Sequence, residues 1–198
     1  MTKTNLQALS FEVNQINQAV KTLSEGGLLL YPTDTIWGIG CDATNAEAVA
    51  KIFALKKRNL SRPLVVLVDS VKMLQDYVAH VHPRIDTLLA YHQRPLTVIY
   101  EQARHLPQNL IGADGSVAIR VVLDDFCRQM IAQFGKPVVA TSANITNEPF
   151  PENFGAISSE VIKGIDFVVR HRQTEKNAQQ PSVLVKVQEN GELVFLRS

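Results

Sequence analysis

Two hydroxyls and a carboxylate follow one another in the segment Pro32-Thr33-Asp34-Thr35. The apolar run from Leu28 to Tyr31 is typical of a short buried strand, and Pro32 ends it because proline has no backbone donor. In open α/β sheets, ligands bind beyond the carboxyl ends of strands. Threonine hydroxyls can donate to carboxylate or phosphate oxygens, and Asp34 can accept from an ammonium or lie near a metal. Taken alone, an ordinary turn with local side-chain to backbone bonds explains the segment at least as well.

A group of basic side chains crosses from the end of an expected helix into the loop before a strand. No acidic residue lies between Lys51 and Asp69 to neutralise it, although the whole chain has a formal net charge of only +1. Arginine forks match phosphate oxygens and lysine adds a point charge, so the group indicates an anion site. Cations that compensate the negative end of a helix dipole are the alternative. The group consists of Lys56, Lys57, Arg58 and Arg62.

Small polar side chains also follow the apolar run Val138–Ala140, in the segment Thr141-Ser142-Ala143-Asn144. Their hydroxyl and amide groups can bind phosphate, ribose or the edge of adenine. A helix cap or an Asx turn is an equally good structural explanation. The segment is therefore a candidate binding loop that needs support from elsewhere in the chain.

A charged residue lies in the expected strand Ser116–Arg120, where alternation places Ser116 and Arg120 on one face. An arginine in an apolar strand needs a partner, because an unpaired buried charge is costly. That partner is either a structural carboxylate or the carboxylate of a ligand. Ser182, after Pro181 at the start of a late strand, and Arg197 are weaker candidates.

Several common site types find no support. Gly38-Ile39-Gly40-Cys41-Asp42-Ala43 fits the G-x-G-x-x-A pattern, but six residues separate it from the preceding strand, and residues 58 to 66 lack the acidic residue that a dinucleotide site requires. These glycines more simply allow close approach of a ligand or a neighbouring strand. No phosphate loop and no nucleophile with a recognisable base occur. Cys41 and Cys127 have no metal-ligand spacing, so we expect reduced thiols and no protein-bound metal.

The elements that must position these groups alternate between helix and strand, and strands crowd towards the end. This order predicts an α/β domain with an open, twisted, mixed sheet and helices packed on it. We expect residues 33–44 to form a loop. Helices are expected at 13–24, 45–57, 70–78, 83–91, 124–134 and 156–163, and strands at 28–31, 63–68, 96–100, 117–122, 137–140, 167–170, 182–187 and 193–196.

Length and composition set the class of protein. The chain has 198 residues, of which 45% are hydrophobic and 20% charged, and this suits one compact domain over residues 1–198 and excludes a disordered chain. The longest apolar runs are far too short to span a bilayer. No signal peptide is visible at the N-terminus, so we expect a cytoplasmic protein without membrane association.

Together, these segments resemble one family, the YrdC-like threonylcarbamoyl-adenylate synthases. Its signature Tyr-Pro-Thr-(Asp/Glu)-Thr-x-Tyr-Gly-Leu-Gly is similar to Tyr31–Gly40, and its Ser-Ala-Asn loop is similar to Ser142–Asn144. Its Lys-x-Arg segment, its Thr-Val-x-x-Arg strand and its late Ser-Thr strand resemble Lys56–Arg58 with Arg62, Ser116–Arg120, and Pro181-Ser182. The matches occur in the family's order and span Gly27 to Arg197.

The resemblance implies a concave, positively charged cleft in which ATP, L-threonine and bicarbonate give threonylcarbamoyl-adenylate and pyrophosphate, usually with Mg²⁺. The product would feed N6-threonylcarbamoyladenosine modification of transfer RNA, which would bring RNA or tRNA-modification proteins as partners. Phosphate binding and catalysis would fall to Lys56 and Arg58, with Arg62 also on the phosphates. Threonine would be bound by Thr35, Arg120 and Ser182, and the nucleotide would also contact Ser116, Ser142, Asn144 and Arg197.

The chain departs from the family pattern mostly in loops near the expected cleft. A related adenylate-forming enzyme with another amino-acid substrate is therefore an alternative. A non-catalytic RNA-binding or ribosome-associated protein that uses the same concavity is a second one. The departures are Trp37, Asn59, Arg94, Val122, Asn147 and Val183.

Overall fold

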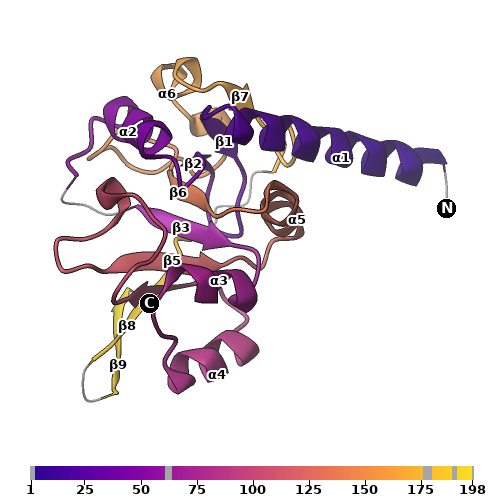
Figure 1. Ribbon diagram of the computed structural model, residues 1–198. Coiled ribbons are helices and arrows are strands. Elements are labelled where there is room, and N and C mark those ends of the chain that lie inside the picture. The colour runs from indigo at the N-terminus through magenta and orange to yellow at the C-terminus, as the bar shows by residue number, and fades with distance from the viewer. Residues whose placement is uncertain (1–2, 61–63, 176–179, 189–190, 198) are drawn as a thin grey trace.

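The computed structural model describes residues 3–60, 64–175, 180–188 and 191–197, with side chains described from residue 10 onward. Its strands form one sheet in the order β7-β1-β2-β6-β3-β5-β4-β8-β9 (Figure 1). The strands are β1 Leu29–Tyr31, β2 Gly38–Gly40, β3 Val65–Val68, β4 Leu96–Tyr100, β5 Val117–Val121, β6 Val138–Ser142, β7 Phe167–Val168, β8 Val183–Val187 and β9 Leu193–Arg197.

The sheet is mixed, as the sequence predicted. Strands β1 and β7, β3 and β5, and β4 and β8 pair in parallel, while the remaining neighbours pair antiparallel. In the centre, Val65 pairs with Ala118 on one side and with Ala140 on the other. Residues far apart in the chain therefore share a short row across the sheet.

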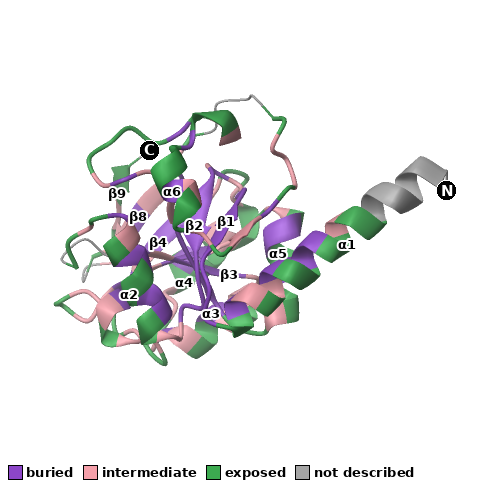
Figure 2. Cartoon of the chain, turned by 90° about the horizontal axis from the view of Figure 1, so that it is seen from above, coloured by how far each residue is buried: buried purple, intermediate pink, exposed green. Residues whose placement is uncertain are grey.

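Helices cover both faces of this sheet (Figures 1 and 2). On one face, α2, α3, α4 and α6 contribute buried residues such as Ile52, Leu74 and Ile85 to the larger core. On the other face, α1 and α5 pack against Leu67 and Val138, and α1 extends beyond the sheet. The helices are α1 Lys3–Ser24, α2 Ala46–Leu55, α3 Val71–Tyr77, α4 Pro83–Tyr91, α5 Asp125–Phe134 and α6 Ser159–Lys163, with 3-10 turns at Gln108–Leu110 and Phe154–Ala156.

Local chemistry explains most helix ends. Asn45 caps α2 by accepting from the backbone N–H groups of Glu47 and Ala48, as an N-cap asparagine commonly does. Asp124 caps α5 by accepting from Cys127, and Gly135 ends that helix in the left-handed conformation. No helix among the described residues is long and apolar enough to cross a membrane.

The structure departs most from the expected element bounds in three places. Residues 33–44 are not all loop, because β2 lies within them and joins β1 to β6. Glycines give little strand signal, and the reason for Gly40 lies on a distant strand: a Cβ there would meet the Val139 carbonyl oxygen at 2.4 Å. Helix α1 begins at Lys3 rather than at residue 13. Helix α6 begins only at Ser159, after its cap Ser158.

Candidate functional site

A cavity of about 260 Å³, here called the cleft, opens on the sheet face that α1 and α5 cover elsewhere. Val65 lines it, while Leu67, two residues along β3 and therefore on the same face, packs in the core beneath those helices. Among the described residues that line it, three are arginines and none is acidic. The lining residues are Thr33, Thr35, Ile36, Gly38, Arg58, Leu64, Val65, Arg120, Ala140, Thr141, Ser142, Phe150, Pro181, Ser182 and Arg197.

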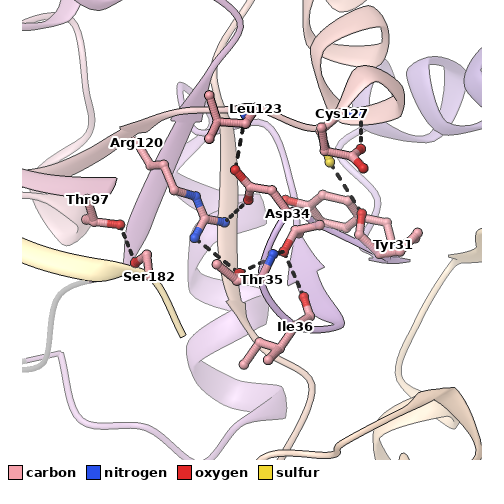
Figure 3. Close-up of polar contacts among 12 residues, drawn as sticks. Tyr31, Asp34, Thr35, Ile36, Thr97, Arg120, Leu123, Cys127 and Ser182 are labelled. Atoms are coloured by element: carbon pink, nitrogen blue, oxygen red, sulfur yellow. Dashed lines mark hydrogen bonds and ion pairs between the residues drawn. The ribbon is translucent and has the colours of Figure 1, made fainter. Parts of the chain in front are cut away.

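At one end of the cleft, a buried guanidinium joins the loop after β1 to strand β5 (Figure 3). Arg120 Nη1 donates to Thr35 Oγ1 at 3.1 Å, and Arg120 Nη2 lies 3.1 Å from Asp34 Oδ1 in an ion pair. Asp34 Oδ2 in turn accepts from the backbone N–H of Leu123 at 3.1 Å. The Nε of Arg120 is buried and has no hydrogen-bond partner, while Arg120 as a residue lines the cavity.

Ser182 enters the same end of the cleft from the segment before β8. Its hydroxyl lies 2.7 Å from Thr97 Oγ1 (Figure 3) and accepts from Arg197 Nη2 at 3.2 Å. Arg197 Nε also donates to the Ser182 carbonyl at 2.8 Å. Desolvation, and then the positive charge of Arg120, lower the pKa of Arg197. The positive charges of Arg120 and Arg197 therefore repel each other. A bound anion would relieve this repulsion.

The loop that carries Thr35 is held from both sides. Thr33 Oγ1 donates to the Ile36 carbonyl at 2.8 Å and accepts from the Thr35 N–H at 3.1 Å. Arg172 Nη1 donates to the Thr33 carbonyl at 3.3 Å and to Asp124 Oδ2 at 2.9 Å. The same Asp124 caps α5, so the position of the loop is tied to a helix N-terminus.

Arg172 is a residue that the sequence interpretation missed. It adopts a positive φ of 61°, which is uncommon for a residue other than glycine. Its Nε donates to Glu175 Oε2 at 2.7 Å, and its side chain is only 17% exposed. In the sequence it stands in a polar stretch without periodicity, and its partners Thr33 and Asp124 are remote, so no local pattern could identify it.

In the structure, Lys56 lies beside the loop after β6 and outside the cavity lining, and its expected contact with phosphates stays a prediction. Lys56 follows the last turn of α2, is 1% exposed, and does not line the cleft. Its Nζ donates to the Ser142 carbonyl, to the Asn144 carbonyl at 2.5 Å and to Asn144 Oδ1 at 3.2 Å. These acceptors use all three donors of the ammonium. Burial, and then the charge of Arg58, lower its pKa to about 8. Lys56 positions the loop after β6.

The other members of the basic group lie in different environments. Arg58 lines the cleft, as expected for a phosphate ligand. Lys57 has a positive φ of 50° and pairs with Glu160 at 2.8 Å on the surface. Arg62 lies outside the described residues. The basic group is thus not one surface, because consecutive side chains point in different directions.

Two further residues predicted to contact the nucleotide, Asn144 and Ser116, differ in their position relative to the cleft. Asn144 does not line the cleft itself, but its Oδ1 accepts from the hydroxyl of Ser142, which does, at 2.5 Å. Ser116 shares a face of β5 with Arg120 but lies beyond the cavity lining, and its Oγ donates to Asp114 Oδ1 at 2.6 Å. The structure therefore brings together Thr35, Arg58, Arg120, Ser142, Ser182 and Arg197, and leaves Ser116 outside the cavity.

Comparison with known proteins identifies the family of the chain. The Sua5_yciO_yrdC family model, described as "Telomere recombination", matches residues 21–198. A threonylcarbamoyl-AMP synthase from Xanthomonas euvesicatoria pv. vesicatoria is 32% identical over 157 residues, which cover 78% of this chain and 84% of that protein.

Solved structures match the fold over a similar span. The P. abyssi Sua5 complexed with L-threonine superimposes with a TM-score of 0.81 at 24% identity over 92% of this chain. The matched part is 53% of that Sua5 chain, so this chain spans about half its length. E. coli YciO superimposes with a TM-score of 0.79 at 18% identity, covering 92% of this chain and 88% of YciO.

Proposed function

Because this chain belongs to the Sua5/YciO/YrdC family, we propose that it makes threonylcarbamoyl-AMP from ATP, L-threonine and bicarbonate, for N6-threonylcarbamoyladenosine modification of transfer RNA in the cytoplasm. The observation that carries this proposal is the meeting of Thr35, Arg120 and Ser182 with Arg58 and Arg197 in one cleft. The curated relatives are named threonylcarbamoyl-AMP synthases, and a Sua5 structure of the same fold contains L-threonine.

The amino acid would bind at the buried end of the cleft. Arg120, whose guanidinium lies at this end of the cleft, would pair with the carboxylate of threonine, and a charge-assisted contact of this kind is stronger than a neutral one. The hydroxyls of Thr35 and Ser182 are already ordered by their neighbours, so they can bind the polar atoms of the substrate with little further loss of entropy.

For the reaction, the protein has to position the substrates and does not have to supply a nucleophile. The amine of threonine attacks the carbon of bicarbonate and water leaves, which gives a carbamate. A carbamate oxygen then attacks the α-phosphorus of ATP while pyrophosphate leaves. Arg58 and Arg197 would neutralise charge on the phosphates, and Ser142 would contact them from the end of β6. Lys56 would act by holding the loop of Ser142 in place.

Mg²⁺ would supply further charge neutralisation when it enters with ATP. Within the described part of the chain, no three metal-ligating side chains form a cluster. The carboxylate beside the cleft, Asp34, is engaged by Arg120 and Leu123. Phosphate oxygens and water would therefore hold the ion, as is common for magnesium nucleotides.

A pyrophosphate-release assay tests this function by omitting one substrate at a time. Release is expected to require ATP, bicarbonate and L-threonine together. Equal release without threonine would refute the substrate assignment, and release with another amino acid would indicate a related enzyme. Salt-sensitive binding of transfer RNA without any ATP-dependent activity would favour the non-catalytic RNA-binding alternative.

A matched pair of variants tests the role of the Arg120 guanidinium in binding threonine. Arg120→Lys keeps the charge but loses the fork, so kcat/KM for threonine is expected to fall roughly 10- to 150-fold. Arg128→Lys, at an exposed position on α5, is the control and is expected to leave it unchanged. Thermal unfolding of both variants separates lost binding from lost folding. A folded Arg120→Lys protein with wild-type kinetics would contradict the role.

A further inference from the structure

One aromatic side chain lies at the edge of the cleft without a role in the reaction described above. Phe150 lines the cavity and is 42% exposed. Of the other apolar side chains that line it, Leu64 and Ala140 are buried, and Ile36, Val65 and Pro181 are half-buried. Among the described residues of the lining, Phe150 is the only aromatic one. Its ring therefore offers an accessible flat surface next to a set of phosphate-binding arginines.

The local sequence holds this ring outward. Proline stands on both sides of it, in Pro149-Phe150-Pro151. Proline fixes its own φ and restricts the residue before it to extended conformations. Pro151 is buried while Phe150 is exposed, so the backbone is anchored directly beside the exposed ring. The backbone that carries the ring consequently has little conformational entropy to lose when a ligand covers the ring.

The segment that carries Phe150 is also fixed at both ends. On one side, Asn144 Nδ2 donates to the Glu148 carbonyl at 2.6 Å, and the Thr146 N–H donates to the Lys56 carbonyl at 2.9 Å. On the other side, Phe154 packs against Trp37 with 4.9 Å between ring centroids. The loop thus presents Phe150 from a rigid frame that also holds Ser142.

We propose that Phe150 binds the purine base of the nucleoside triphosphate by stacking on it. Arginines and hydroxyls supply what the phosphates need, but a planar apolar base requires a flat apolar surface. Stacking on an aromatic side chain gives that contact without a specific hydrogen-bond pattern. This inference rests on the proposed function, since it concerns the nucleotide end of the same cleft.

Calorimetric titration of the protein with ATP and, separately, with inorganic pyrophosphate tests this role. Phe150→Ala is expected to weaken ATP binding roughly 5- to 150-fold, the range for loss of one base–aromatic stack. Pyrophosphate has no base, so its affinity is expected to stay unchanged. Phe150→Trp restores an aromatic surface and is expected to recover ATP binding.

A phenylalanine far from the cleft serves as the control for the loss of an exposed ring. Phe11→Ala removes a phenylalanine of similar exposure, 46%, on α1 and is expected to bind ATP as the wild type does. Unchanged ATP affinity in Phe150→Ala, or an equal loss for pyrophosphate, would overturn the stacking role while the proposed function stands. Wild-type protein that binds no ATP would refute the proposed function itself. Loss of transfer RNA binding alone would assign Phe150 to RNA instead.

Discussion

Replacing Gly40 by alanine should disrupt the junction between β1, β2 and β6. A Cβ at this position would lie 2.4 Å from the Val139 carbonyl oxygen and 2.6 Å from Tyr31 Cε1. Neither neighbour can move freely, because Tyr31 is fully buried and its hydroxyl donates to that same carbonyl at 2.9 Å. Tyr31 directly precedes the loop of Thr35, so the strain would reach the cleft.

The magnitude follows from three contributions to the free energy of unfolding. Overpacking a buried position costs about 1–3 kcal/mol, and the hydrogen bond of Tyr31 contributes about 1 kcal/mol. Alanine recovers about 0.5–1 kcal/mol by reducing the entropy of the unfolded chain. Gly40→Ala is therefore expected to lower the free energy of unfolding by about 1–3.5 kcal/mol.

Gly38→Ala is a matched control in the same strand. The nearest atom to a Cβ at Gly38 is the Thr141 carbonyl oxygen at 3.4 Å, an ordinary van der Waals distance. We expect this variant to be as stable as the wild type or up to about 1 kcal/mol more stable. Urea unfolding measures both, and Gly40→Ala within about 0.5 kcal/mol of Gly38→Ala would refute the steric argument.

Three further perturbations probe buried charges and thiols. Asp34→Asn leaves Arg120 without its counter-charge and should destabilise the protein by about 3–5 kcal/mol, so an unchanged melting temperature would contradict the buried ion pair. The pKa of Lys56, about 8 in the folded state, lies below its unfolded value, so the unfolded chain binds more protons and stability should rise between about pH 8 and pH 10.5. That rise, about 3 kcal/mol in total, should vanish in Lys56→Met, as urea unfolding across this pH range can show. Burial raises the pKa of both Cys41 and Cys127, so native protein should resist alkylation at pH 8, and rapid labelling by mass spectrometry would count against their burial.

The sequence could predict those features that depend on neighbouring residues. Alternation and caps located most helices and strands, and α4 and β4 have the expected bounds. Polar groups at strand ends indicated the cleft, because parallel strand ends gather at one edge of a sheet. Helix caps and strand alternation act within a few residues, and the cleft followed from a general rule of sheet topology.

The features that the sequence did not predict depend on contacts between distant segments. Lys56 seemed free to bind phosphate, but its acceptors at Ser142 and Asn144 lie more than 80 residues away. Gly40 was expected to lie in a loop. The reason for a glycine there is a carbonyl of the distant strand β6, which the local sequence does not show. Such distant partners set the direction of a side chain at the end of a helix or strand. A single sequence does not reveal which residues those partners are.

The position of β8 and β9 at the margin of the sheet has a consequence for how activity is lost. Ser182 and Arg197 reach the cleft through this hairpin, which is held to the rest of the sheet by the pairing of β8 with β4. Marginal hairpins open with less free energy than a protein's centre. Partial unfolding of the hairpin would remove the serine and an arginine while the central strands remain native. Catalytic lifetime at high temperature would then depend on fraying of this margin and not on global unfolding.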